Sequence, residues 1–189
     1  PFEILEYDPY NVKIFSQLFD KLISLGIIPV VPTGSLGNME GTITGIAALG
    51  NCITVGGLDT TSSRIRCYSY SSAGPAGKDD KPNLVAACVD LCSLNSNPNY
   101  IPERNGVKLY PHKLEKAYTT YTGTSCAAAY ISGIIAMLIE NNSELQFKDI
   151  CSLIKVSSNR IDESHWLQGD GILDVKKLLY NKEKIAQRK

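Results

Sequence analysis

The first part of the chain shows a helical pattern of apolar residues followed by a short apolar run. Over residues 11–25, apolar side chains recur at three- and four-residue spacing, which predicts an amphipathic helix. Asp8 is suited to cap the start of this helix, and Gly26 is suited to end it. The continuous apolar run 27–31 predicts a buried strand, with Pro29 near its start. A helix followed closely by a buried strand is half of a βαβ unit.

Short apolar segments further along the chain predict more strands. Residues 52–57 and 84–89 are apolar runs bounded by turns and predict buried strands, whereas residues 67–71 alternate only weakly. Residues 118–122 alternate as a further strand. Residues 32–45 are rich in Gly, Ser and Thr and predict a loop at the carboxyl end of a strand. In open parallel α/β sheets, functional sites collect at those ends.

The second half of the chain holds a long polar stretch and the remaining helices. Residues 95–116 predict a surface loop with a hairpin at Asn105-Gly106. Residues 125–140 carry almost no charge and are rich in Ala and Ile, which predicts a helix buried on nearly every side. Residues 147–154 predict an amphipathic helix, and a last helix leads into a charged tail at 181–189.

Composition and charge narrow the function only by exclusion. The chain has 189 residues and a mass of 20.6 kDa, which suits one domain or part of a larger one. It carries 19 basic and 19 acidic residues, so its net charge gives no reason to expect a nucleic-acid or acidic-membrane partner. The apolar content of 43% predicts a folded protein. The longest apolar runs are too short to cross a bilayer, and no signal peptide is visible.

The cysteines and histidines do not form a metal-binding pattern. The six cysteines are scattered without a Cys-x-x-Cys pair, and His112 and His165 lie apart from them. We therefore expect no metal, no cofactor and small buried thiols. An even number of cysteines also allows disulfides, so the sequence leaves the cellular compartment open.

The segment 121–129 offers the clearest chemistry in the chain. A predicted strand ends, Gly123 and Thr124 turn the chain, and Ser125 opens the Ala-rich helix. Ser125 could be an N-cap that accepts hydrogen bonds from the first turn. It could also be a nucleophile, because the helix dipole and the first-turn N–H groups stabilise negative charge on a scissile carbonyl. The residues of this segment alone favour the N-cap and leave the nucleophile as the alternative.

Five motifs, in one order along the chain, resemble those of the subtilisin-like serine proteases. Gly123-Thr124-Ser125-Cys126-Ala127-Ala128, with Gly133 further along, resembles the nucleophile motif of that family. The other four motifs are Gly56-Gly57-Leu58-Asp59, Tyr70-Ser71-Ser72-Ala73-Gly74-Pro75, Asn83-Leu84-Val85-Ala86 and Gly169-Asp170-Gly171-Ile172-Leu173-Asp174-Val175. The resemblance covers nearly the whole chain. It implies that residues 1–180 are the C-terminal part of a peptidase domain, followed by the tail 181–189.

The resemblance also implies a fold and an activity. The fold is α/β with three layers, a mainly parallel sheet flanked by helices, and it is incomplete in this chain. The activity is that of a serine endopeptidase, which hydrolyses peptide bonds through an acyl-enzyme on Ser125. The family's Asp and His precede the region matched here, so neither His112 nor His165 takes the place of the base. The implied partners are a polypeptide substrate and the upstream half of the same domain.

Four residues after the predicted strand 27–31 are the remaining site residues that the resemblance implies. Pro32, Thr33 and Gly34 line the substrate cleft through their backbones. Ser35 takes the position of the family's oxyanion-binding Asn, and its hydroxyl is shorter than an amide. The loss of one such donor costs about 3–4 kcal/mol of transition-state stabilisation. Asn38 is a nearby alternative donor.

Two other functions compete with an active protease. A subtilase-like pseudoenzyme would bind peptides or a partner protein without cleaving them, and Ser35 favours this alternative. An acyl hydrolase of the α/β-hydrolase fold would need a Gly-x-Ser-x-Gly elbow, which the segment around Ser125 lacks.

Overall fold

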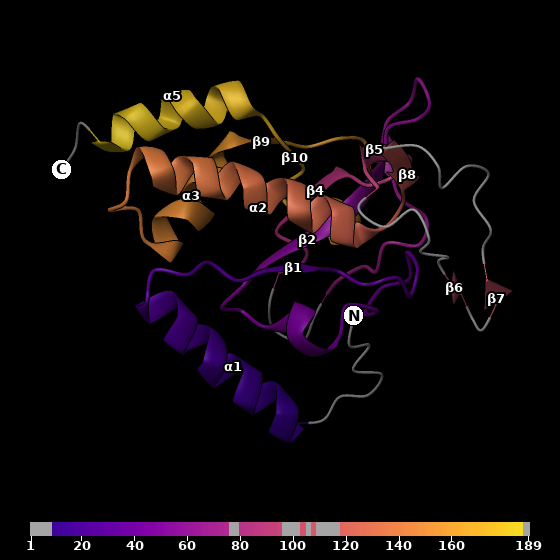
Figure 1. Ribbon diagram of the computed structural model, residues 1–189, viewed down its shortest axis with the longest axis horizontal. Coiled ribbons are helices and arrows are strands. Elements are labelled where there is room, and N and C mark those ends of the chain that lie inside the picture. Colours follow the sequence, from indigo (N-terminus) through magenta and orange to yellow (C-terminus); the bar gives the residue numbers. More distant parts are fainter. Residues whose placement is uncertain (1–8, 76–79, 96–102, 105–106, 109–117, 187–189) are drawn as a thin grey trace.

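Helices cover both faces of one mostly parallel sheet in the computed structural model, which describes residues 9–75, 80–95, 103–104, 107–108 and 118–186 (Figure 1). The helices are α1 (Pro9–Ser24), α2 (Thr124–Asn141), α3 (Phe147–Ser157), α4 (His165–Gln168) and α5 (Val175–Ala186), with a 3-10 turn η1 (Gly45–Ala48). The strands are β1 (Val30–Pro32), β2 (Ile53–Asp59), β3 (Arg66–Cys67), β4 (Leu84–Ala87), β5 (Leu91–Leu94), β6 (Glu103–Arg104), β7 (Val107–Lys108), β8 (Tyr118–Tyr121), β9 (Ser158–Asn159) and β10 (Ile172–Leu173). The predicted α/β class is confirmed.

The main sheet has the strand order β1-β2-β4-β10-β9, with β3 paired to β2. β1, β2, β4 and β10 run parallel, whereas β9 and β3 pair antiparallel with β10 and β2. β1 lies at one edge, and no other described strand pairs with it besides β2. The carboxyl ends of β1, β2 and β4 therefore lie along one side of the sheet, which is where ligand sites form in open parallel sheets.

Alternation along the strands divides the core between the two faces of the sheet. Leu84 and Ala86 of β4 pack in the same cluster as Ile131 of α2. Val85, between them, belongs to a second cluster with Leu58. This period of two is what a strand covered on both faces requires.

α1 covers the sheet on the face opposite α2. Phe19 of α1 packs with Val31 of β1 and with Ala47 of η1, all three nearly inaccessible to solvent. Figure 1 shows α1 and α2 on opposite sides of β1 and β2. The result is the predicted arrangement of a sheet flanked by helices.

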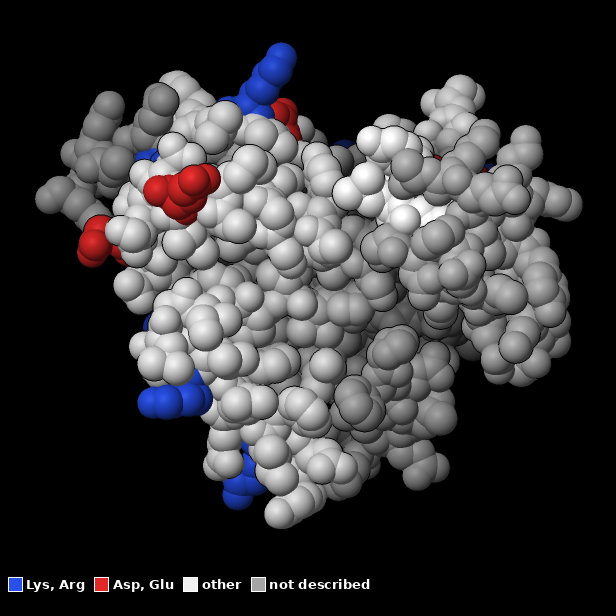
Figure 2. Space-filling model, viewed as in Figure 1, with Lys and Arg blue, Asp and Glu red and all other residues white. Residues whose placement is uncertain are grey.

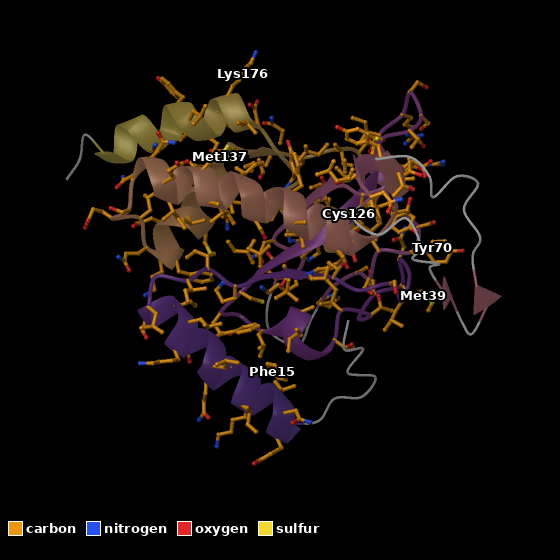
Figure 3. All side chains as sticks on the ribbon, in the orientation of Figure 1. Phe15, Met39, Tyr70, Cys126, Met137 and Lys176 are labelled. Carbon is orange, nitrogen blue, oxygen red and sulfur yellow. The ribbon has the colours of Figure 1, made fainter. Side chains whose placement is uncertain are left out.

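α2 is buried on one face only, which corrects the prediction of a helix buried on nearly every side. Its buried residues are Thr124, Ala127, Ala128, Ile131, Ile134, Ile135 and Leu138. The opposite, exposed side contains Ala129, Tyr130, Gly133, Ala136 and Met137, which we call the open face of α2. Charged side chains lie toward the edges of this view, and the middle of α2 carries none (Figures 2 and 3). An apolar composition predicted burial, but it could not show that one side lacks a neighbour.

The length and composition of α2 would also allow it to cross a membrane. The core helices of soluble proteins pass the same test, and 39% of the apolar window in α2 is already buried against the rest of the chain. This finding is weak evidence for a membrane span.

Several element boundaries differ from the predictions. β1 begins at Val30, after Pro29, which has no N–H to donate to a strand ladder. Only Cys67 of the predicted 67–71 segment is in a strand, because the chain turns next, with the Ser71 N–H donating to the Tyr68 carbonyl at 2.8 Å. β5 was not predicted.

Other expected features are present or lie outside the described residues. β6 and β7 pair antiparallel on either side of residues 105–106, as the predicted hairpin requires. α5 extends through Ala186, so the first part of the predicted tail 181–189 is helical. Asp8 and His112 lie outside the described residues.

Lys81 is a buried cation that joins two segments of the sheet. Its side chain is 3% exposed, and its Nζ donates to the Cys52 carbonyl at 2.8 Å and to Asn83 Oδ1 at 3.0 Å. Asn83 Oδ1 also accepts the Thr54 N–H at 2.7 Å. Lys81 thereby fastens the segment before β4 to the start of β2.

Candidate active site

Ser125 lies in the first turn of α2, and its side chain is exposed. The preceding Gly123 is the N-cap residue, with a φ of 153° that favours glycine. Its N–H donates to the Cys88 carbonyl at 2.9 Å, which ties the turn to the end of β4. Since Gly123 is the N-cap, Ser125 does not act as one. In the described part of the chain, the Ser125 hydroxyl has no hydrogen-bond partner.

Thr124 connects the start of α2 to the loop after β1. Its hydroxyl is almost fully buried and donates to the Gly34 carbonyl at 3.2 Å. Ser125 follows Thr124, and Ser35 follows Gly34, so this bond brings the predicted nucleophile and the predicted oxyanion donor to the same side of the sheet. Cys126 of α2 and Met39 of this loop also lie toward one end of the molecule in Figure 3.

Contacts with β2 and with the serines of the 70–72 turn fix the backbone of residues 32–35 where it leaves the sheet. Pro32 ends β1, and the Thr33 N–H still donates to the Val55 carbonyl of β2 at 3.0 Å. The Thr33 hydroxyl is buried, 3.1 Å from Ser71 Oγ. Gly34 has a φ of 97°, and a Cβ there would lie 3.3 Å from Ser72 Oγ. Only glycine fits this position without strain, and Ser35 then emerges exposed to solvent.

Asn38 has its side chain committed elsewhere. Oriented to satisfy its hydrogen bonds, the amide nitrogen donates to the carbonyls of Tyr68 and Ser71, both at 2.9 Å. These bonds hold the amide against the turn after β3. They argue against Asn38 as the alternative oxyanion donor, which leaves Ser35 as the side-chain candidate from this loop.

His165 and Ser125 lie near opposite ends of the parallel strands. Its Nε2 lies 2.5 Å from Asp80 Oδ1, and its Nδ1 lies 3.0 Å from the Gly169 carbonyl. His165 lines a hollow of about 250 Å³ with Ile53 and Asn83, which stand at the amino ends of β2 and β4. Ser125 and Ser35 instead stand near the carboxyl ends, so His165 cannot serve as their base. His112 lies outside the described residues.

The cysteines near Ser125 are poor nucleophiles at neutral pH. Burial raises the pKa of the Cys126 thiol, next to Ser125. Burial also raises the pKa of Cys88, below the turn, to about 12. Because the thiolate is the reactive form, Ser125 is the better nucleophile candidate in this turn. None of the six cysteines, which all lie within the described residues, is in a disulfide. Cys92 is exposed, which departs from the expectation of buried thiols.

The described residues contain no group of three or more His, Cys, Asp or Glu side chains that could hold a metal ion. A second hollow, of about 180 Å³, lies between the ends of β2 and β4 and Tyr130 of α2. Ser125 lines neither hollow, so the predicted cleft in front of it stays a prediction. What the arrangement offers chemically is a hydroxyl beside the free N–H groups of a helix start and beside the loop 32–35.

Sequence reasoning named Ser125, Pro32, Thr33, Gly34 and Ser35, and it did not foresee the supporting contacts. Those contacts come from Thr124 and from the consecutive serines Ser71 and Ser72, which are all nearly inaccessible to solvent. Each belongs to one of the recognised motifs. Sequence reasoning placed Thr124 and Ser72 in turns and Ser71 in a weakly alternating segment, so membership of those motifs was the signal they carried.

Comparison with known proteins gives matches along most of the chain. The model of the subtilase family, peptidase S8, matches residues 14–172. Serine protease AprX from Bacillus subtilis (strain 168) is 28% identical over 180 residues, which are 92% of this chain and 40% of AprX. The chain thus spans less than half of this relative's length.

Solved structures match the fold. Fervidolysin from Fervidobacterium pennivorans, described as a keratinolytic enzyme related to subtilisin, superposes with a TM-score of 0.67 at 21% identity. That match covers 87% of this chain and 24% of fervidolysin. The prenylagaramide maturation protease PagA gives a TM-score of 0.67 at 15% identity, covering 96% of this chain and 58% of PagA. At such identities the likeness extends to the fold alone.

Proposed function

Since this chain belongs to the subtilase family, we propose that it is the C-terminal part of a serine endopeptidase domain with Ser125 as the nucleophile. The observation that carries the proposal is the hydrogen bond from Thr124 to the Gly34 carbonyl, at 3.2 Å. It joins the start of α2 to the loop that contains Ser35. In this proposal residues 1–180 belong to the peptidase domain, and residues 181–189 are a tail that begins within α5.

The proposed reaction uses the exposed hydroxyl of Ser125 on a polypeptide substrate. Its Oγ forms a bond to the carbonyl carbon of the scissile peptide and gives its proton to a base. The C–N bond then breaks, the amine leaves with that proton, and water later hydrolyses the ester on Ser125. The Ser125 N–H and the Ser35 hydroxyl would donate to the oxyanion. The backbones of Pro32, Thr33 and Gly34 would line the substrate side.

The base and its orienting carboxylate would come from the upstream half of the domain. Two surfaces of this chain support such a partner: the open face of α2 and the edge of β1 that no described strand pairs with. Gly133 lies in the middle of α2, and a Cβ built there meets nothing within 4 Å. A glycine inside a helix costs about 1 kcal/mol relative to Ala. A closely packed second helix would account for that cost.

A second candidate function is a pseudoenzyme that binds peptides or a protein without cleaving them. Two observations favour it: Ser35 stands where the family has Asn, and the described residues supply no base near Ser125. The intact Gly123-Thr124-Ser125 turn favours the enzyme, because a binding module has no need of an exposed hydroxyl at a helix start.

Fluorophosphonate labelling of the complete polypeptide that contains this chain tests the proposal. We expect stoichiometric labelling and peptide hydrolysis, both lost in Ser125→Ala. Ser152→Ala is the matched control, because Ser152 is an exposed helical serine whose hydroxyl donates to the Lys148 carbonyl of its own helix. The 189-residue chain alone should not be labelled. A complete polypeptide that is neither labelled nor active would favour the pseudoenzyme.

A further inference from the structure

Ser71 and Ser72 are consecutive buried serines that perform different tasks. The exposed fraction of each is 1%. Ser71 Oγ accepts the Gly57 N–H at 3.1 Å and lies 3.1 Å from the Thr33 hydroxyl, so it fastens the end of β1 to β2. Within the described part of the chain, Ser72 makes no such contact with a strand. Its contacts go to the loop 34–36 instead.

Ser72 holds the chain on both sides of Ser35. Its N–H donates to the Gly34 carbonyl at 3.3 Å, immediately before Ser35. Its Oγ accepts the Leu36 N–H at 2.9 Å, immediately after Ser35. The Gly34 carbonyl also accepts the Thr124 hydroxyl, so the same oxygen is bound by Ser72 and by the start of α2.

The two bonds have a consequence for the Ser35 side chain. With the peptide groups before and after it fixed, Ser35 loses most of its backbone freedom although its side chain is exposed. The Gly37 N–H adds a third bond, to the Tyr70 carbonyl at 3.1 Å. The 70–72 turn thus holds the loop in place, and Ser72 is the member of the turn whose side chain binds the backbone of residues 34–36.

We propose that Ser72 is a positioning residue for catalysis, which aims the Ser35 hydroxyl at the oxyanion by holding the Gly34 carbonyl and the Leu36 N–H. This proposal rests on the proposed function of Ser125 and Ser35. Ser72 is too deeply buried to contact a substrate. It acts by keeping a donor in place before charge develops, which is what makes such donors effective.

The test is Ser72→Ala in the complete polypeptide, because alanine removes the hydroxyl and keeps the backbone N–H. We expect kcat to fall about tenfold while KM stays within about twofold, since a displaced oxyanion donor acts on the transition state. A peptide boronate, which forms a tetrahedral adduct with the serine, should bind about tenfold more weakly.

Ser157→Ala is the matched control. Ser157 is fully buried, and its Oγ accepts one N–H, from Asn181 Nδ2 at 3.0 Å, between α3 and α5. It should leave kcat, KM and boronate affinity at their wild-type values. An unchanged kcat in Ser72→Ala, or an equal loss of kcat in Ser157→Ala, would overturn the proposal.

Amide hydrogen exchange separates this proposal from the proposed function. Ser72→Ala should speed exchange of the Leu36 N–H by about tenfold, because that N–H loses its acceptor, whereas Ser157→Ala should not. If the wild-type polypeptide is not labelled by fluorophosphonate, the proposed function fails and the exchange result alone decides whether Ser72 holds the loop. Unchanged exchange of the Leu36 N–H in Ser72→Ala would show that Ser72 does not hold the loop.

Discussion

Ser35 presents a hydroxyl at the position where the resemblance to the family implies the longer amide of an Asn. Its side chain is exposed, and Ser72 holds the loop around it by hydrogen bonds to the Gly34 carbonyl and the Leu36 N–H. A hydroxyl rotates and is one bond shorter than an Asn amide, so it reaches a developing oxyanion less well. In the proposed site, the side-chain contribution to oxyanion stabilisation therefore depends on Ser35, whose backbone is already held in place.

Ser35→Asn should raise kcat of the complete polypeptide by at least about tenfold, with little change in KM. The reason is that the amide donor acts on charge that exists only in the transition state. Steady-state kinetics on a peptide substrate measures both constants. A change confined to KM would mean that residues 32–35 bind substrate without contacting the oxyanion. Ser62→Asn, in the exposed turn before β3, is the control substitution.

The residues of the proposed site could be named from the sequence only in part. Gly-Thr-Ser at a strand-to-helix turn is a local signal, so Ser125 could be named from the sequence. The contact between Thr124 and Gly34 joins residues that are 90 positions apart, and no local pattern encodes it. Ser72 could not be distinguished from Ser71 for the same reason: both are serines at one turn, and only tertiary contacts separate their roles.

At the scale of elements, α5 begins at a well-formed cap. Asp174 Oδ1 accepts the Lys177 N–H at 3.0 Å, and Asp174 Oδ2 accepts from Asn159 Nδ2 at 3.3 Å. The bond to the Lys177 N–H, with a smaller contribution from Asn159, holds the pKa of Asp174 below its ordinary value of 3.8. A carboxylate at a helix start also interacts favourably with the helix dipole.

Asp174→Ala should lower the urea midpoint of unfolding, because the first turn of α5 loses its acceptor. Asp174→Asn should lose less, since its amide oxygen still accepts. A lowered pKa stabilises the folded state above 3.8, and that stabilisation is lost as the pH falls through the lower, folded-state pKa. The stability difference between wild type and Asp174→Asn should therefore shrink in acid. A difference that is independent of pH would contradict this assignment.

The existence of helices and strands was predicted better than their boundaries and their burial. α1, β2 and α3 follow directly from apolar spacing. β5 was missed because β8 is its only partner among the described strands and because it has one half-buried and three exposed residues, so it lacks the apolar signal of a core strand. The one-sided burial of α2 could not be predicted, because composition gives the apolar character of a helix and not the presence of neighbours.

At the scale of the whole molecule, the open face of α2 is an exposed surface without charged side chains, and the middle of the view in Figure 2 shows few charges. Tyr130 is 56% exposed and Met137 is 55% exposed on it. Ser125 stands at the end of the same helix. A partner seated on this face would thus lie beside the proposed nucleophile, as the proposed upstream half must.

Gly133→Leu tests this arrangement. It should leave the fold of this chain intact, because its Cβ meets no atom within 4 Å and leucine favours a helix over glycine by roughly 0.8 kcal/mol. In the complete polypeptide it should lower the melting temperature and abolish labelling of Ser125, because leucine would collide with the packed upstream half. Lys176→Leu, at an exposed position of α5, is the control for an added leucine. If Gly133→Leu changes neither the melting temperature nor the labelling of the complete polypeptide, the open face of α2 does not contact the upstream half.

Because the amine of Lys81 is buried, the rate at which it is acylated reports how often this end of the sheet opens. An amine acylates only when the reagent can reach it, and Lys81 is sealed between the starts of β2 and β4, whereas Lys176 is exposed. Brief treatment with an N-hydroxysuccinimide ester, read by peptide mass spectrometry, should modify Lys176 at once and Lys81 only as molecules open. The rate at Lys81 should rise with urea while that at Lys176 stays nearly flat. Equal rates without urea would mean that this end of the sheet is already open.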